Sequence, residues 1–197
     1  MKNNSRNDIL KWALTLFSQK GYESTSPNEI VEAVGITKPT LYYFFGDKEG
    51  LLDSLLSENY TKLNETLDRL CTYVPDPENY ANDVNPLLIR VTKGIFEFAV
   101  ANKEFYMLNI SLNSAPIASK SAVIAEKYSC RQHETLTQMF ASISAIHKNL
   151  EGKEEALAFR FISLLNAHII LWFRGKGDLS DTVAESIVKG FMHGIFS

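Results

Sequence analysis

The feature that most constrains this chain is a close alternation of helix-starting and helix-ending residues near its N-terminus. Ser26 is followed by a proline and, three positions later, by Glu29, which is the pattern of a capping box, and Gly35 ends the helix that this box starts. Thr37 begins a second helix, and Gly46 breaks it. The sequence therefore predicts two short helices separated only by a glycine and one further residue.

Helical periodicity continues along nearly the whole chain, and no β-hairpin signal such as Asn-Gly interrupts it. An amphipathic helix that ends at Gly21 precedes the two short ones, and Asp47 caps a helix that runs to about Tyr73, roughly 40 Å long. Residues 75–86 hold three prolines and form the clearest loop. Further helices are expected over about 87–101, 104–114, 117–146, 152–173 and 180–196. This pattern predicts an all-α protein.

Charge and composition exclude several classes of protein. The chain has 45% hydrophobic and 22% charged residues and a net charge of -3, which are ordinary values for a globular protein. Residues 1–22 nevertheless carry four basic side chains against one acidic, and a local basic patch can bind phosphates on an acidic protein. Cys71 and Cys130 form no CxxC motif and indicate neither a disulfide framework nor a metal site. We expect no signal peptide, no membrane span and a cytoplasmic location.

The two short helices have the spacing of a helix-turn-helix, in which the second helix enters the major groove of DNA. Side chains on that helix can bond to base edges, contact a thymine methyl group or bind phosphates, and residues at the neighbouring helix N-termini can hold phosphates. Spacing alone leaves a purely structural role open, since tyrosines are often half-buried surface residues. The predicted DNA contacts are Thr25, Ser26, Thr37, Lys38, Pro39, Thr40, Tyr42, Tyr43 and Lys48.

The stretch TSPNEIVEAVGITKPTLYYFFGDKEGLL resembles the DNA-binding signature of the TetR family of bacterial transcriptional regulators, over about residues 8–55. The resemblance implies an N-terminal three-helix helix-turn-helix DNA-binding head, residues 1–50, and a C-terminal helical ligand-binding and dimerisation bundle, residues 51–197. It also implies a homodimer and assigns DNA contact to the residues of the second helix. Phe44 departs from the tyrosine or histidine usual in the family and cannot bond a phosphate, so we expect it in the core.

The last two predicted helices indicate a dimer interface. Residues 154–173 are apolar on more than one face, and such a helix must be covered on both sides. A monomeric core is the alternative interpretation. The predicted interface residues are Leu157, Phe161, Leu164, Leu165, His168, Trp172, Ile187, Phe191, Gly194 and Ile195.

The remaining helices could enclose an effector pocket with apolar walls and a few polar groups. The candidates are Phe96, Phe105, Tyr106, Met107, Asn109, Tyr128, His133 and Asn166, each of which could equally be an ordinary core or surface residue. His133 and His168 have no second ligand at helical spacing, so we expect no metal.

The sequence thus predicts a homodimeric repressor that binds a palindromic double-stranded operator and is released by an unidentified small-molecule effector. A transcriptional activator or a non-repressing DNA-binding protein of the same fold is the alternative. No nucleophile–base pair or phosphate-binding glycine loop indicates an enzyme, and no cofactor is expected.

Overall fold

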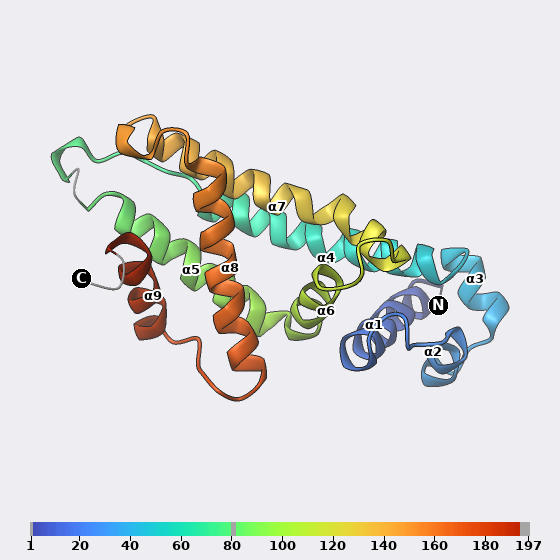
Figure 1. Ribbon diagram of the computed structural model, residues 1–197. Helices are drawn as coiled ribbons and strands as arrows, with labels where there is room; N and C mark the ends of the chain where they lie inside the picture. The colour runs from blue at the N-terminus through green and yellow to red at the C-terminus, as the bar shows by residue number, and fades with distance from the viewer. Residues whose placement is uncertain (1, 80–81, 194–197) are drawn as a thin grey trace. The chain divides into compact units, whose positions relative to one another are not determined.

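A computed structural model describes residues 2–79 and 82–193 of the chain. Over these residues the structure contains α-helices and short 3-10 turns and no β-strand (Figure 1), so the all-α prediction is confirmed. The α-helices are α1 (Lys2–Lys20), α2 (Pro27–Val34), α3 (Lys38–Phe45), α4 (Lys48–Leu70), α5 (Val84–Ala101), α6 (Lys103–Asn113), α7 (Lys120–Ser144), α8 (Glu154–Phe173) and α9 (Asp181–His193). Two 3-10 turns, η1 (Pro77–Asn79) and η2 (Lys148–Leu150), lie in the connections.

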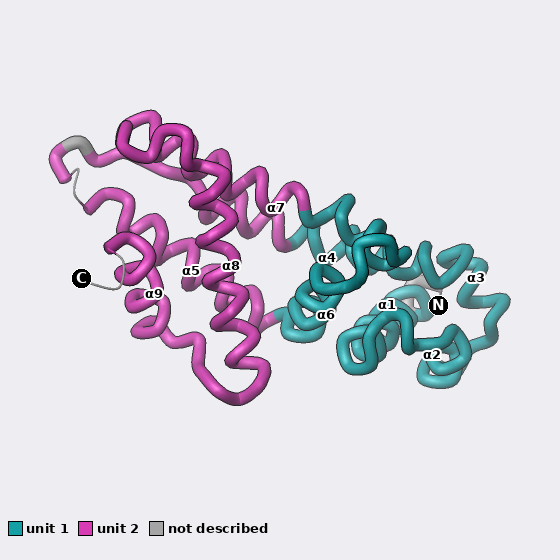
Figure 2. The backbone as a smooth tube through the Cα atoms, in the orientation of Figure 1, with its two compact units in different colours: residues 1–62, 102–129 teal, residues 63–101, 130–197 magenta. Residues whose placement is uncertain are grey.

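The chain forms two compact units, which Figure 2 colours separately. Unit 1 comprises residues 1–62 and 102–129, and unit 2 comprises residues 63–101 and 130–197. The long helices α4 and α7 contribute residues to both units. These packing units are a different division from the head and bundle expected on functional grounds, and that functional boundary near residue 50 stays a prediction.

Helix α2 starts where the sequence indicates, because its capping box is complete. The Ser26 hydroxyl accepts a hydrogen bond from the Glu29 backbone nitrogen at 3.3 Å, and the Glu29 carboxylate accepts one from the Ser26 backbone nitrogen at 2.8 Å. Gly35 ends the helix with φ 74°, a left-handed conformation that favours glycine. Both ends of this eight-residue helix are therefore fixed by local chemistry.

The core of unit 1 holds the short helices in place. The buried side chains are supplied by α1, by the turn after it and by the inner faces of α2 and α3. The Phe17 and Tyr22 rings meet edge to face with centroids 5.1 Å apart. On the two short helices, Ile30, Val31, Leu41 and Phe45 are buried. Short helices are marginal alone, so burial of these side chains stabilises them.

The core of unit 2 is built from α5, α8 and α9, with α7 completing it. An aromatic cluster joins three of these helices. The Phe161 ring lies 6.1 Å from Phe140 and 5.2 Å from Phe191, centroid to centroid. Phe161 and Ile169 of α8 are fully buried here. Helix α8 therefore contributes one complete face to the core of its own chain.

The capping box predicts a specific pH dependence of stability. A hydrogen bond from Lys20 Nζ at 2.6 Å, together with those from Ser26, lowers the pKa of the Glu29 carboxyl from 4.5 to about 2. Because the folded pKa is depressed, the stabilisation is present above the unfolded value and is lost as pH falls through the folded one. The free energy of unfolding of Glu29→Gln should lie below that of the unmodified protein by a constant amount above about pH 5, a difference that shrinks between pH 4.5 and about 2.

Urea unfolding at a series of pH values measures this difference. Glu32→Gln, an exposed change on the same helix, serves as the control. A Glu29→Gln difference that stays constant to pH 2 would contradict the assignment.

Candidate nucleic-acid interface

Helix α3 presents most of its residues to the surface. Its eight residues bury only Leu41 and Phe45, at 0% and 8% exposure. Tyr42 and Tyr43 are 41% and 72% exposed. Thr37, Lys38 and Pro39 at its start are also exposed, and Thr40 is half-buried. The helix therefore offers a surface of one cation, two hydroxyls, a proline ring and two phenols.

The start of α3 has a hydroxyl pair that the sequence alone does not reveal. Thr37 occupies the N-cap position with extended backbone, but its side chain caps no backbone nitrogen. Instead its hydroxyl lies 3.0 Å from the Thr40 hydroxyl. One hydroxyl donates to the other, so the pair still has a donor and acceptor lone pairs to offer at the same place. That arrangement suits a base edge or a phosphate oxygen.

Lys48, in the first turn of α4, is held over an aromatic ring. Its ammonium nitrogen lies 4.1 Å from the centre of the Tyr22 ring, within the range of a cation–π contact. Burial in this position lowers the pKa of Lys48, while the Glu23 and Glu49 carboxylates oppose that shift. Burial raises the pKa of Tyr22, so its ring stays uncharged and attractive to the cation. Tyr22, which is not among the predicted DNA contacts, is thus the support for Lys48.

Asp47 completes this helix start. Its carboxylate accepts a hydrogen bond from the Gly50 backbone nitrogen at 2.7 Å, which makes it the cap of α4. One of the unpaired backbone nitrogens at the N-terminus of α4 is therefore already satisfied. An incoming phosphate would depend more on the Lys48 ammonium than on the helix N-terminus.

Thr25 requires a correction. Its side chain is 1% exposed, and its hydroxyl donates to the Gly21 carbonyl oxygen at 2.9 Å. The hydroxyl is occupied in closing the turn between α1 and α2, so it is not presented to DNA. The neighbouring Ser26 is exposed, and its hydroxyl accepts from the Glu29 nitrogen while keeping its own proton to donate.

Two of the basic side chains near the N-terminus are already paired. The Arg6 guanidinium contacts the Glu58 carboxylate at 2.6 Å and lies 5.5 Å from the centre of the Phe45 ring. Lys20 pairs with Glu29 at 2.6 Å. These pairs are partly exposed, so they stabilise the fold modestly and reduce the local positive charge available for phosphates. Phe44 is half-buried and stacks edge to face on Tyr43 at 5.3 Å, which places it at the edge of the core rather than inside it.

The predicted effector residues are divided between the two units. Four of them, Phe105, Tyr106, Asn109 and Tyr128, belong to unit 1. There the Tyr60 hydroxyl donates to the Asn109 side-chain oxygen at 2.5 Å and the Tyr60 ring stacks on Tyr128. Met107 is also in unit 1, whereas Phe96, His133 and Asn166 are in unit 2. Their assignment to an effector pocket stays a prediction.

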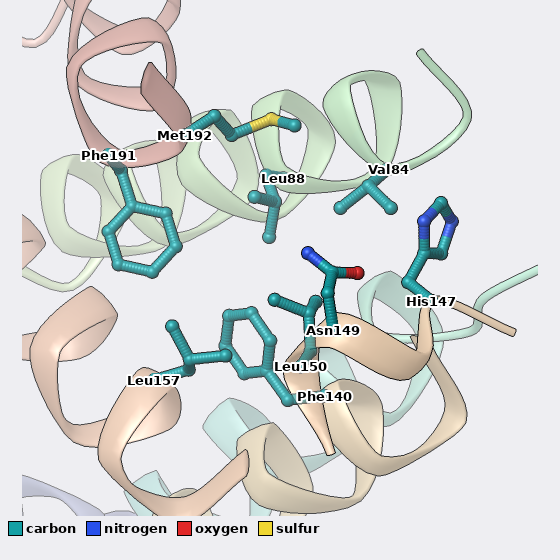
Figure 3. A pocket seen from close by; sticks show the side chains of 9 residues that line it. All are labelled: Val84, Leu88, Phe140, His147, Asn149, Leu150, Leu157, Phe191 and Met192. Carbon is teal, nitrogen blue, oxygen red and sulfur yellow. The ribbon is translucent and has the colours of Figure 1, made fainter. Parts of the chain in front are cut away.

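Unit 2 contains a cavity of about 330 Å³ whose walls come from other residues (Figure 3). Its lining is mostly aliphatic and aromatic, with an imidazole and an amide at one side. The lining residues are Val84, Leu88, Phe140, His147, Asn149, Leu150, Leu157, Phe191 and Met192. They come from α5, α7, the η2 region, α8 and α9, so no single stretch of sequence predicts the cavity.

The predicted dimer residues divide into four groups. Phe161 and Leu165 at 0% exposure and Ile187 at 6% lie in the core of their own chain, so their assignment to an interface is corrected. Leu157 and Phe191 line the cavity, and Leu164, His168 and Trp172 are partly exposed. Gly194 and Ile195 lie outside the described residues.

Two large apolar side chains of α8 are exposed. Phe159 is 64% exposed and Leu171 is 41% exposed. By length and composition α8 could cross a membrane, with a mean hydropathy of 1.6 over eighteen residues, of which only 22% are buried. A core helix of a soluble protein can pass the same test, but such a helix is mostly buried. The low burial shows that α8 has apolar surface beyond what its own unit covers.

Comparison with known proteins agrees with this architecture. Residues 9–55 match the family model for bacterial regulatory proteins of the tetR family. The chain is 22% identical to the uncharacterized HTH-type transcriptional regulator YdgC of Bacillus subtilis, covering 95% of this chain and 93% of that protein. It is 31% identical to YuxN, an uncharacterized HTH-type regulator of the same organism, over 92% of this chain but 62% of YuxN.

Solved structures show the same fold. The transcriptional regulator FadR from Bacillus subtilis, in complex with stearoyl-CoA, matches with a TM-score of 0.78 at 16% identity, over 96% of this chain and 98% of FadR. AibR, in complex with isovaleryl coenzyme A and operator DNA, matches with a TM-score of 0.70 at 23% identity, over 94% and 96% of the two chains.

A capped helix-turn-helix with an exposed, polar second helix, followed by a wholly helical remainder over the described residues, defines a helix-turn-helix transcriptional regulator. Residues 9–55 therefore form a DNA-binding domain of the tetR family of bacterial regulatory proteins, and the chain as a whole has the fold of TetR-family regulators.

The geometry around Lys48 generates a prediction about DNA affinity. Lys48→Ala should weaken binding to all DNA sequences alike and reduce the slope of log K against log salt by about 0.9, the value for one lost phosphate contact. Tyr22→Leu should weaken binding by about fivefold, because a cation–π contact of about 1 kcal/mol no longer holds Lys48 in place. Tyr22→Phe keeps the ring and should bind normally. Fluorescence titration of a DNA duplex at several salt concentrations measures these effects.

The melting temperature of each variant, measured alongside, separates a folding defect from a binding defect. A Lys48→Ala protein with unchanged salt slope would exclude the phosphate contact.

Proposed function

We propose that this protein is a homodimeric repressor that binds a palindromic operator through α2 and α3 and leaves it when a small molecule binds the helical bundle. The observation that carries the proposal is the surface of α3, an eight-residue helix anchored by two buried side chains, with four of its other six residues exposed. A cytoplasmic location follows from this role.

Sequence reading is assigned to the start of α3. Lys38 can bond a guanine edge, and the Thr37–Thr40 hydroxyl pair can bond a base or a phosphate. Pro39 offers an apolar contact to a thymine methyl group. Tyr42 and Tyr43 lie on the exposed side of the helix, where phenol hydroxyls can contact phosphates and fix the orientation of the head.

Dimerisation is assigned to the exposed face of α8. Soluble proteins rarely leave a large contiguous apolar surface uncovered, and Phe159 and Leu171 are both exposed on this helix. On α9, a Cβ added at Gly190 would meet nothing within 4 Å, so this position leaves open space beside the helix. A second copy of the chain, packed with its α8 against this one, would cover both chains at once.

Release by a small molecule is supported by the cavity in unit 2 and by the fold neighbours. FadR and AibR were each solved with a coenzyme A thioester. In this chain the cavity of about 330 Å³ falls at the low end of ligand pockets in proteins. Ligand and operator would then weaken each other's binding by one shared coupling energy, commonly about 1–3 kcal/mol.

A selection of DNA sequences from a random library, at fixed physiological salt, tests the proposed function. We expect a palindromic motif whose half-sites lie about one helical turn or a multiple apart, near 34 Å per turn. Lys38→Ala should change the base preference within each half-site and leave the spacing unchanged. Weak binding without sequence preference would overturn the operator assignment, and binding with preference but activation in a transcription assay would replace repression by the alternative.

The dimer has its own test. Phe159→Arg should shift the protein from about twice the 22.2 kDa chain mass to the mass of one chain in sedimentation at micromolar concentration, because two arginines would meet across the interface. Val100→Arg, at 52% exposure on α5, is the matched control and should stay dimeric. A dimeric Phe159→Arg protein would remove α8 as the interface.

A further inference from the structure

The side chains that line the cavity in unit 2 restrict the kind of molecule that it can bind. Seven of its nine lining residues are apolar, and two of these are phenylalanines, Phe140 and Phe191. A methionine, Met192, closes one side, and its flexible thioether adapts to rings (Figure 3). The occupant must therefore be mostly apolar.

The size of the cavity sets a limit as well. An apolar cavity of about 150 Å³ holds benzene, so one of about 330 Å³ holds roughly a dozen non-hydrogen atoms. A long acyl chain exceeds that number, and a coenzyme A group exceeds it several times. The cavity is suited to a compact molecule.

The polar side of the cavity contains an imidazole that is hydrogen-bonded to a carboxylate. Among the described residues of the lining, His147 is the one ionisable group, and its Nε2 lies 2.8 Å from Oδ1 of Asp83. The Tyr73 hydroxyl donates to the other oxygen of the same carboxylate at 2.5 Å. Burial would raise the pKa of Asp83, but the hydrogen bonds from Tyr73 and the Asp76 backbone and the neighbouring His147 lower it, so the carboxylate is ionised. His147 and Tyr73 are therefore both hydrogen-bonded to the Asp83 carboxylate.

Asn149 supplies the hydrogen-bonding group. In Figure 3 its amide lies among the side chains of Leu88, Leu150 and His147. A side-chain amide both donates and accepts, so it pairs with a hydroxyl or a carbonyl and has no charge to offer a carboxylate or a phosphate.

We infer that this cavity is a binding site for a compact, uncharged, mostly apolar molecule with one hydrogen-bonding group, such as a substituted phenol. The inference rests on the proposed function for its regulatory meaning, since it names the class of effector. It separates this chain from its fold neighbours FadR and AibR, whose ligands carry the charged coenzyme A group.

The test uses the full-length protein, isothermal calorimetry and a matched pair of probes. The neutral probe is 4-butylphenol and the charged probe is 4-butylbenzoate, which share one hydrocarbon body. We expect the benzoate to bind at least about tenfold more weakly, because the cavity has no cation to compensate a buried carboxylate. Binding of the phenol should show the negative heat-capacity change of apolar burial. Equal or tighter binding of the benzoate, or no binding of the phenol, would overturn the inference.

Two positions on α5 give a matched pair of variants. Val84 lines the cavity, and Val100 is 52% exposed on the same helix. Val84→Phe should fill the cavity and weaken binding of 4-butylphenol by at least about tenfold, while Val100→Phe should change it by less than about twofold. Leu157→Trp, on the opposite wall, repeats the test if Val84→Phe unfolds. Unchanged affinity in folded Val84→Phe and Leu157→Trp proteins would place the probe elsewhere.

Asn149→Ala tests the polar contact. It should weaken binding of 4-butylphenol by about fivefold and leave binding of butylbenzene unchanged, since only the phenol uses the amide. An equal loss for both probes would show that Asn149 acts through packing and would remove the hydrogen bond from the inference.

Operator binding, measured with and without 4-butylphenol, separates this inference from the proposed function. If the phenol binds at the cavity but operator affinity is unaffected, the site stands and release by a ligand is wrong. If no operator is found while the phenol pair behaves as expected, the repressor assignment falls and the site again stands.

Discussion

The DNA-facing part of this protein depends on how a helix of eight residues is held in place. Helix α3 is too short to be stable alone, and its two fully buried side chains, Leu41 and Phe45, attach it to the core of unit 1. Because these two lie four positions apart, they occupy one face of the helix and leave the others outward. The same packing that stabilises α3 therefore also determines which side chains DNA can meet.

Several basic side chains of unit 1 form ion pairs with carboxylates at the surface. Arg6 and Lys20 are each paired with a carboxylate, and Lys120 contacts Glu49 at 2.6 Å. Lys48 differs, because its nearest partner is the neutral ring of Tyr22. The Tyr22 ring holds the ammonium in position without an ion pair, which leaves Lys48 able to contact a phosphate.

The sequence was sufficient for features that depend on local chemistry. The capping box at Ser26, the left-handed Gly35 and the cap at Asp47 were predicted, because each involves residues a few positions apart. Thr25 was assigned wrongly for a related reason. Its hydroxyl bonds the carbonyl of Gly21 in the preceding turn, and a pattern of residue types does not show whether a hydroxyl faces outward or back to its own backbone.

Features that depend on distant segments could not be predicted in this way. Phe161 and Leu165 have the same apolar character as Phe159, yet the first two are fully buried in their own chain and the third is 64% exposed. Periodicity identifies an apolar face but does not say whether the same chain or a second copy covers it. The cavity was missed because its walls come from segments as far apart as Val84 and Met192.

Helix α8 connects the two proposals about unit 2, because it has an inner and an outer apolar face. Leu157 on the inner side lines the cavity, and Phe159 two positions later is exposed on the surface assigned to the dimer. A ligand can change DNA binding only if it binds one conformation of the protein more tightly than another. Phe191 of α9 packs on Phe161 of α8 at 5.2 Å and also lines the cavity, so a molecule that displaces this ring must alter the packing between these two helices. Under both proposals, a ligand in the cavity would affect the second copy of the chain through the dimer surface on α8.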